Sequence, residues 1–390
     1  MSIKEEALEL RDYVVSQRRY MHSHPELSAK EYETTKHITE ELRDTGAETI
    51  TFSDITGVIG IIKGTLPGKT VMLRADIDAL PISEPPNKPY SSQNIGVMHA
   101  CGHDCHAAML LGAAKLLAAH RSELHGTVKL LFQMGEEIGR SSENYVKNGS
   151  LDGTDAIFGM HVWPLIESGK ANFEDGERMA SSDRFSISIY GKSSPAGMPE
   201  TGHDSIAAAA SVVMALQAIV SRLNSPANSL VISVGMMNGG ETEETVACKT
   251  ELVGTVRTFN REFRQNIPRL IEKTAQNAAA IYACTAELDY AFLPGPVINE
   301  HTNLTKTARS AAEKILGKDG LVPFNKVLGA EDFSILMEKT PGVFGFLGTR
   351  NEKKGISCSL HHPMFEADED ILPYGAAIYA QFAIDYLNGK

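Results

Sequence analysis

The sequence has few cysteines, no excess of basic residues and no stretch that predicts a membrane span. Its five cysteines are scattered over 390 residues without the spacing of a disulfide framework, which favours a reducing cytoplasm. The formal net charge of -12 argues against the basic face that nucleic-acid binding requires. No apolar run approaches the ~18–20 residues that a membrane-spanning helix needs, and the charged, amphipathic first residues are not typical of a signal peptide. We therefore expect a cytoplasmic protein that binds neither nucleic acid nor membranes.

The chain also lacks internal repeats, low-complexity tracts and long linkers. Its length exceeds what one hydrophobic core usually serves, so two domains are expected. Apolar, β-branched runs alternate with helical patterns outside residues 183–294, which predicts an α/β catalytic domain with a mixed, largely parallel sheet flanked by helices. This domain would comprise residues 1–182 and 295–390. The expected strands in its first part are 57–64, 70–77, 126–133 and 155–162.

Residues 183–294 have a different pattern. Period-two alternation, as in 184–191, is typical of half-exposed antiparallel strands. The order strand, helix, strand, strand, helix, strand predicts an inserted ferredoxin-like α+β (βαββαβ) domain that serves as a lid or a dimerisation domain. Its sheet edge or one of its helices is suited to pairing with a second copy of the chain.

Residues 98–106 (Met-His-Ala-Cys-Gly-His-Asp-Cys-His) concentrate the side chains that bind borderline-soft cations. Thiolate, imidazole and carboxylate groups are the usual ligands of zinc. A helix-like run follows His106, so the donors would be held at a helix N-terminus. The alternatives are a buried cysteine with polar loop neighbours, or a redox pair of Cys101 and Cys105, which the intervening histidine argues against. This stretch alone therefore favours a metal site without establishing it.

Further candidate ligands follow the expected strands. Asp76 and Asp78 close one strand, Glu136 and Glu137 follow the next, and His161 closes the last. In parallel sheets, binding groups collect at the carboxyl ends of the strands, so these residues are expected to meet at one edge. Taken alone, the two glutamates also fit a solvated helix start. His22 and His24 precede Pro25, which ends a helix, and are interpreted as structural.

Two metal ions about 3.5–4 Å apart can share a bridging ligand and a bridging water, which makes hydroxide available near neutral pH. Neighbouring side chains on a loop can diverge, so one of two adjacent glutamates can bind metal while the other acts as general base. The candidates for such a centre are Cys101, His103, Glu136, Glu137, His161 and His361.

Eight motifs in order resemble the di-metal amidohydrolase and exopeptidase family of aminoacylases, hippurate hydrolase and plant indole-acetyl–amino-acid hydrolases, more distantly related to glutamate carboxypeptidase. The most specific are Leu-Arg-Ala-Asp-Ile-Asp-Ala-Leu-Pro, His-Ala-Cys-Gly-His-Asp and Gly-Glu-Glu. The matching stretches run nearly end to end, at residues 19–28, 73–81, 99–104, 135–137, 159–164, 254–259, 329–333 and 360–363.

The resemblance implies a role for each matching residue. Cys101 would bridge two divalent ions (zinc, manganese or cobalt), and Glu136 would take a proton from the bridging water and pass it to the leaving amine. Asp76 would orient a metal-bound histidine, and Arg257 would attract a substrate carboxylate. His361 rather than His362 is the expected last ligand, since the family places it two residues before proline. The full implied ligand set is Cys101, His103, Glu137, His161 and His361.

The inserted domain departs from the family at two positions. Pro195 stands where a histidine that stabilises the oxyanion is expected, and proline has no side-chain donor. Losing one such donor typically costs on the order of 10²–10³ in rate. Glu244 stands where relatives have an asparagine, and it would repel a substrate carboxylate. His203 is near enough in sequence to compensate for Pro195, although a solvated histidine at a helix start is the simpler interpretation.

These observations predict a homodimeric, metal-dependent amidohydrolase that cleaves N-acyl amino acids or similar small amides. One alternative is a dipeptidase or carboxypeptidase that uses the same centre. Another is a catalytically weakened binding protein, which Pro195 and Glu244 would explain. Turnover of an N-acyl amino acid compared with that of a free dipeptide separates the two enzymes. Absence of turnover with metal loaded would favour the binding protein.

Overall fold

The computed structural model describes residues 1–389, and these divide into two compact units. The first unit contains Met1–Arg178, Ile298–Asn325 and the described residues from Asp332 on. The second contains Met179–Val297 and Lys326–Glu331. The units differ from the predicted boundaries mainly in 326–331. That segment belongs with the second unit because Ala180 N donates hydrogen bonds to Val327 O (3.2 Å) and Gly329 O (2.8 Å).

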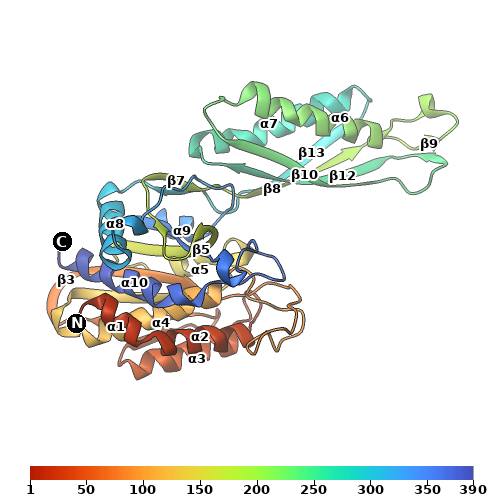
Figure 1. Ribbon diagram of the computed structural model, residues 1–390. Helices are drawn as coiled ribbons and strands as arrows, with labels where there is room; N and C mark the ends of the chain where they lie inside the picture. The colour runs from red at the N-terminus through yellow and green to blue at the C-terminus, as the bar shows by residue number, and fades with distance from the viewer. Residues whose placement is uncertain (390) are drawn as a thin grey trace. The chain divides into compact units, whose positions relative to one another are not determined.

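A seven-stranded mixed sheet forms the centre of the first unit (Figure 1). Its order is β1-β2-β4-β3-β5-β15-β6. The four strands β4, β3, β5 and β15 pair in parallel, and the outer strands pair antiparallel. The predicted fold class is confirmed. The strands are β1 (Glu48–Thr51), β2 (Val58–Lys63), β3 (Leu66–Asp76), β4 (His125–Gln133), β5 (Ala156–Glu167), β6 (Ala171–Asn172) and β15 (Gly342–Arg350).

Helices cover this sheet, and the parallel strands are buried on both faces, as their nearly continuous apolar sequences require. Residues 3–23 form two helices that meet at Leu10, whose backbone N–H donates to Glu6 O. The helices of this unit are α1 (Ile3–Glu9), α2 (Arg11–Ser23), α3 (Tyr32–Asp44), α4 (His103–Ala119), α5 (Ser142–Lys147), α8 (Thr302–Leu316), α9 (Phe333–Met337) and α10 (Leu372–Leu387).

The second unit is an antiparallel four-stranded sheet with two helices on one face (Figure 1). The strand order β10-β12-β8-β13 and the βαββαβ connectivity are those of a ferredoxin-like sandwich. Its elements are β8 (Asp183–Tyr190), α6 (Ser205–Ala218), β10 (Leu230–Gly239), β12 (Lys249–Thr258), α7 (Arg261–Ala280) and β13 (Thr285–Ala291). The short strands of the chain are β7 (Gly176–Met179), β9 (Ser194–Pro195), β11 (Thr245–Val246) and β14 (Val297–Asn299).

The prediction that no apolar stretch is long enough to span a membrane is wrong for α6 and the turn that continues it. Among residues 1–389, the helix Ser205–Leu223 passes that test by length and composition, with a mean hydropathy of 1.8. Core helices of soluble proteins pass the same test. In this helix Ala208, Val212 and Leu216 form a stripe with helical spacing that is buried in the core of the second unit.

Candidate metal centre

Most of the predicted ligands lie at or just after the ends of neighbouring parallel strands or at the start of α4, and His361 lies in the segment 357–368. β3 ends at Asp76, and β4 ends at Gln133, just before Glu136 and Glu137. The sequence predicted that His161 closes its strand. In the structure His161 lies within β5, because β5 continues to Glu167. The pairing of β3 with β5 nevertheless stops at Arg74 and Gly159. His161 therefore lies just beyond the paired region, on the side where the other donors collect.

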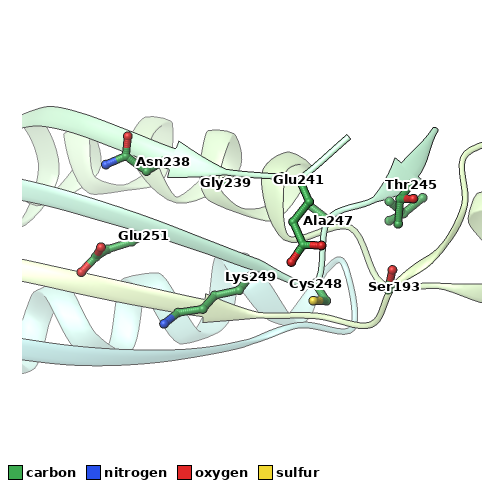
Figure 2. A pocket seen from close by; sticks show the side chains of 11 residues that line it. Ser193, Asn238, Gly239, Glu241, Thr245, Ala247, Cys248, Lys249 and Glu251 are labelled. Atoms are coloured by element: carbon green, nitrogen blue, oxygen red, sulfur yellow. The ribbon is translucent and has the colours of Figure 1, made fainter. Parts of the chain in front are cut away.

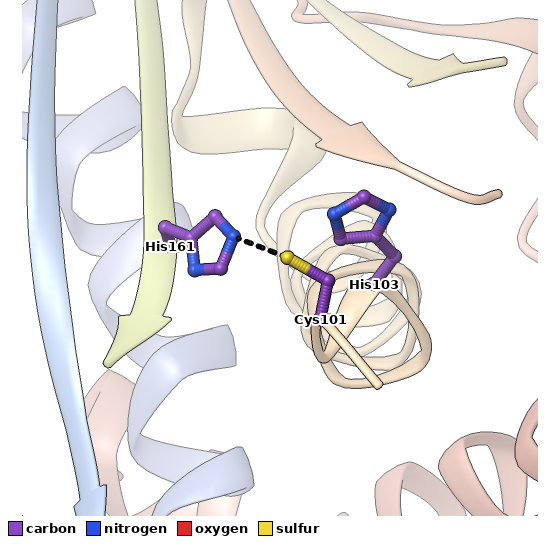
Figure 3. A group of neighbouring side chains, drawn as sticks. All are labelled: Cys101, His103 and His161. Atoms are coloured by element: carbon purple, nitrogen blue, oxygen red, sulfur yellow. Dashed lines mark hydrogen bonds between the residues drawn. The ribbon is translucent and has the colours of Figure 1, made fainter. Parts of the chain in front are cut away.

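One group of donors consists of Cys101, His103 and His161, all of them buried (Figure 3). One ligand atom from each lies within 4.8 Å of the other two, and Cys101 Sγ is 3.4 Å from His161 Nε2. Gly102 lies between the cysteine and His103 with a left-handed φ of 85°. A Cβ there would lie 2.4 Å from Val162 Cγ2. Only glycine therefore lets the chain turn tightly enough for both neighbours to reach the site.

A second group consists of Cys101, Glu137 and His361, and it shares the thiol of the first group. His361 Nε2 lies 3.4 Å from Glu137 Oε1, and the backbone N–H of His361 donates to Ala100 O at 2.8 Å. His362 is turned to another role, since its Nδ1 accepts a hydrogen bond from Met364 N at 3.0 Å. The structure thus brings together the predicted set from four separate parts of the chain.

The two adjacent glutamates diverge within one short turn. Both contribute an oxygen to a third group with His103, in which the ligand atoms again lie within 4.8 Å of one another. Glu136 Oε1 accepts a hydrogen bond from Asp332 N at 3.2 Å, whereas the backbone N–H of Glu137 donates to Asp78 Oδ2 at 3.0 Å. Glu137 is thereby held toward the shared cysteine, and Glu136 remains beside it as a candidate base.

Two buried atoms show that this site fits a cation. Within the part of the chain that the structure describes, His103 Nε2 and Glu137 Oε1 have no hydrogen-bond partner. Their nearest charged neighbours belong to the same cluster, with Asp76 Oδ2 3.6 Å from His103 Nε2 and His361 Nε2 3.4 Å from Glu137 Oε1. A buried polar atom that makes no hydrogen bond is costly. A donor set of thiol, imidazole and carboxylate is the one that zinc and related transition metals prefer. The residues present therefore fit metal ions.

Electrostatics at the site also favour a cation. Burial disfavours a charge on His103, but Asp76 and Asp78 outweigh burial and raise its pKa to about 10. Burial raises the pKa of the Cys101 thiol well above its usual range, and the nearby Glu137 and Glu136 add to this effect. The local excess of carboxylates thus stabilises positive charge and holds the cysteine protonated until a cation is present.

The structure corrects the role predicted for Asp76. Asp78 Oδ1, not Asp76, lies 3.0 Å from His103 Nδ1, the ring nitrogen opposite the unpartnered Nε2. Asp76 Oδ1 accepts instead from His106 Nδ1 at 2.5 Å, and His106 Nε2 accepts from Val162 N at 2.8 Å. Asp78 is therefore the carboxylate that orients the candidate ligand. The sequence signal was the second aspartate two positions further along, in the same Asp-Ile-Asp motif.

Arg257 and both departures from the family lie in the second unit. Arg257 is on β12 and donates from Nη1 to Leu328 O at 3.2 Å. β9 and β11 pair so that Pro195 lies opposite Thr245, and Ala196 N donates to Glu244 O at 2.8 Å. Pro195 and Glu244 are therefore neighbours on one short two-stranded ribbon, although they lie far apart in the sequence.

A cleft of about 320 Å³ adjoins this ribbon (Figure 2). Thr245 and Val246 of β11 line it together with the carboxylates of Glu241 and Glu251. The cleft is distinct from the donor groups described above, because its lining residues all belong to the second unit. The polar lining residues are Ser193, Asn238, Glu241, Thr245, Cys248, Lys249 and Glu251.

Comparison with known proteins gives consistent results. The model of peptidase family M20/M25/M40 matches residues 72–385. N-acetylcysteine deacetylase of Bacillus subtilis is 40% identical over 373 residues, which cover 95% of this chain and 96% of the relative. IAA-amino acid hydrolase ILR1-like 2 of Arabidopsis thaliana is 39% identical over 387 residues (98% and 87% covered). Thermostable carboxypeptidase 2 of Saccharolobus solfataricus is 36% identical over 389 residues (99% and 98% covered).

A solved structure supports the same relationship. The YXEP protein of Bacillus subtilis, described as a dinuclear metal-binding peptidase of the M20 family, superposes with a TM-score of 0.87 at 36% identity. The superposition covers 98% of this chain and 99% of that one. The similarity thus extends over both compact units.

Proposed function

Because this chain belongs to peptidase family M20/M25/M40, we propose that it is a two-metal amidohydrolase that releases an amino acid from its N-acyl derivative. Membership confirms the predicted resemblance, and the hydrolysis of amide bonds is the activity of the enzyme. Relatives named as an N-acetylcysteine deacetylase and an IAA-amino acid hydrolase support an acyl group on the nitrogen of an amino acid as the substrate class. The identities of the acyl group and of the amine are determined by pocket walls that carry no readable motif.

One observation carries the proposal: two groups of three donors share the thiol of Cys101. A thiolate shared in this way would suit two divalent ions, of which His103 and His161 would hold one and Glu137 and His361 would hold the other. Zinc, manganese or cobalt are the ions expected for this ligand set. Such ions, when bound, supply a hydroxide near neutral pH and polarise the amide carbonyl.

The remaining chemistry belongs to the residues of the chain. In this proposal Glu136 would accept a proton from the attacking water and donate it to the leaving amine, as a general base and then a general acid. The hydrogen bond from Asp332 N to Glu136 Oε1 orients this carboxylate. Asp78 holds the ring of His103, and Arg257 is the candidate contact for the substrate carboxylate.

A dipeptidase or carboxypeptidase activity is the second candidate, because relatives named as thermostable carboxypeptidases match almost the whole chain. Both reactions begin with the same attack of water on an amide carbonyl. They differ in the group on the acyl side of that amide, which is a simple acyl group in one case and an amino acid or peptide in the other. The deciding experiment is a screen of metal-loaded protein on N-acetyl and N-benzoyl amino acids, aryl amides and free dipeptides. Preference for N-acyl amino acids supports the proposal, and preference for dipeptides supports the second candidate.

The screen also tests the consequence of Pro195 and Glu244. A chelator-treated sample is the control, and activity should return when zinc, manganese or cobalt is added back. No turnover on any substrate by protein with two bound ions per chain would contradict the enzymatic proposal and favour a binding protein with a weakened centre.

Removal of the shared donor should affect both ions, whereas removal of an unshared donor should affect one. We expect Cys101→Ala to lose nearly all bound metal, and His361→Ala to retain about one of two ions per chain. Elemental analysis of dialysed protein measures both. Equal metal contents in the two variants would argue against a bridging thiolate.

The proposal includes a homodimer formed through the second unit. β10 is an edge strand of its sheet, and an unpaired edge is a template for another strand. Met236 and Met237 on β10 are exposed, and so are Ile206 and Met214 on the apolar helix α6. An exposed apolar surface of this kind is typical of a protein interface.

A cytoplasmic location completes the proposal. Each of the five cysteines, all within the described residues, is a free thiol. A bridging thiolate requires that Cys101 stay reduced, which a reducing compartment ensures.

A further inference from the structure

A fully buried arginine that belongs to none of the donor groups makes ion pairs beside the candidate metal centre. Arg18 of α2 is completely buried and makes ion pairs with three carboxylates. Its Nε donates to Asp104 Oδ2 (2.8 Å), and its two terminal nitrogens donate to Glu366 (2.6 Å) and Glu369 (3.1 Å). The planar fork of a guanidinium fixes the directions of all three bonds at once.

The three carboxylates belong to the two segments that carry Cys101 and His361. Asp104 follows His103 in the first turn of α4, three residues after Cys101. Glu366 and Glu369 follow His361 in the C-terminal part of the chain. Arg18 therefore ties the segment that presents the cysteine to the segment that presents the last histidine.

A loop that leads into the cysteine is fastened to the same network. His22, which the sequence predicted to be structural, bonds Asp104 through Nδ1 (2.7 Å) and Glu84 through Nε2 (3.1 Å). Lys88 pairs with Glu366, and the ring of Tyr90 lies 5.0 Å from the guanidinium of Arg18. Residues 84–90 thus share their anchoring partners with the C-terminal segment.

His361 needs such anchoring more than the other donors do. Its φ of 63° is left-handed, which is unfavourable for a residue with a side chain, and its side chain is 54% exposed. Residues 357–368, all of which the structure describes, form no helix or strand. A strained conformation on such a segment persists only where the surroundings determine it. The anchors of this segment are the bond from His361 N to Ala100 O, the fully buried ring of Phe365, and the ion pairs that Arg18, Arg19 and Lys88 make with Glu366 and Glu369. Arg18 also pairs with Asp104, near Cys101.

We propose that Arg18 is a positioning residue for the Cys101–Glu137–His361 half of the metal centre, a role that rests on the proposed function. By clamping Glu366 and Glu369 against Asp104, it holds His361 in the conformation that reaches Glu137 and the shared thiol. The donor group Cys101–His103–His161 depends less on Arg18. His103 is fixed within α4 and by Asp78, and His161 is fixed within β5.

The test is the metal stoichiometry of Arg18→Met. We expect the wild type to bind about two ions per chain, and Arg18→Met to bind one ion normally and the second with an affinity that is lower on the order of 10–100-fold, as for other outer partners of ligands. Arg18→Lys, which keeps the charge but loses the fork, should lie between them. Cobalt titration of metal-free protein, followed by the thiolate-to-cobalt absorption, and elemental analysis both measure this.

Arg264→Met is the matched control. Arg264 is a similarly buried arginine in the second unit and pairs with Asp183 at 2.6 Å. We expect its loss to lower stability while both ions remain bound. Loss of the second ion in this variant as well would show that any broken buried ion pair has this effect, and would overturn the specific role of Arg18.

A double-mutant comparison identifies the half-site concerned. If Arg18 acts through His361, then Arg18→Met added to His361→Ala should cause no further loss of metal. A further loss of metal would overturn the proposal, because it would show that Arg18 also affects the donor group Cys101–His103–His161. Two ions bound with wild-type affinity in Arg18→Met would overturn this inference alone, whereas a wild type without bound metal would overturn the proposed function.

Discussion

Cys101 connects the two halves of the proposed centre, and its neighbours explain why a cysteine is usable there. Buried among Glu136, Glu137 and Asp76, the thiol has a pKa well above its usual range. Ions that bind His103 and His361 would bring the opposing positive charge to the same space, and a coordinating thiol is deprotonated outright. Metal binding should therefore release protons. The chemistry of each donor is set by its neighbours as much as by its own side chain.

Glu136→Gln should separate binding from catalysis. The amide keeps the shape of the side chain and still accepts from Asp332 N, but it cannot take a proton from water. We expect metal content near that of the wild type and a kcat lower by about 10²–10⁴. Elemental analysis and amide hydrolysis measure the two quantities, with Glu40→Gln on the exposed face of α3 as the control. Unchanged turnover would refute the role of Glu136 as the base.

Glu31 should make the stability of the protein depend on pH. The side chain is buried, which raises its pKa from 4.5 to about 7 against the opposing effect of its hydrogen bond from Thr56. Between these two values the unfolded chain releases the proton before the folded chain does. The free energy of unfolding should therefore fall as pH rises from about 4.5 to about 7, by up to about 3 kcal/mol, and then stop falling.

Glu31→Gln tests this assignment. The carboxylate accepts hydrogen bonds from Ala29 N, Gly135 N and Thr56 Oγ1. The amide oxygen can accept the two backbone bonds while its NH₂ group donates to the threonine hydroxyl. We expect urea unfolding of the variant to show a smaller loss of stability between about pH 5 and pH 8 than the wild type shows. An identical pH dependence in both proteins would contradict the raised pKa.

At the scale of elements, the site depends on how closely α4 packs. The helix begins at His103, so any shift along or away from its neighbours moves a candidate ligand. Gly112 lies where α4 meets two other helices, and a Cβ there would lie 2.8 Å from Val14 Cγ2 and 2.9 Å from Ala376 Cβ. The position of the donors is thus coupled to contacts with α2 and α10.

Gly112→Ala should destabilise the first unit despite the better helix propensity of alanine. Overpacking typically costs about 1–3 kcal/mol, and the propensity gain offsets about 1 kcal/mol of that. We expect a net loss in the free energy of urea unfolding. Ser310→Ala, on the exposed face of α8, is the control for propensity alone. Stabilisation by Gly112→Ala would show that α2, α4 and α10 can move apart at this point with little loss of free energy.

At the scale of the whole molecule, the chain leaves the first unit and returns to it, so that one continuous insertion forms most of the second unit. This second unit has its own hydrophobic core. Its edge strand and the outer face of α6 remain exposed in a single chain. A second copy is the partner that the homodimer proposal assigns to them.

Met214→Glu tests the dimer. This methionine is 73% exposed on α6, and a buried charge without a partner at an interface is strongly unfavourable. We expect sedimentation to show a shift from two chains toward one, with the fold retained by circular dichroism. Leu165→Glu, at a leucine that is 63% exposed in the first unit, should leave the mass unchanged. A monomeric wild type would contradict the proposal directly.

Much of the fold was readable because hydrophobic periodicity reports burial. The parallel strands are apolar throughout, and the strands of the second unit alternate, so each class was predicted from its own pattern. The break between α1 and α2 at Leu10 leaves no signal in the sequence, because the amphipathic pattern continues across it. The helix α6 was predicted, but the length of its apolar stretch was missed because alanines and serines dilute its hydropathy, although only one charged residue, Arg222, interrupts residues 205–223.

The sequence by itself determined which chemistry is available. Thiol, imidazole and carboxylate groups at the ends of strands and at a helix start predict a cation site, since few other functions need that combination. Only the tertiary structure decided how the groups are used. It showed that Cys101 belongs to two triads, that Asp78 and not Asp76 supports His103, and that a buried arginine joins the segments of Cys101 and His361. These are contacts between residues as many as 351 positions apart, and a linear pattern records what a residue is but not which distant residue it meets.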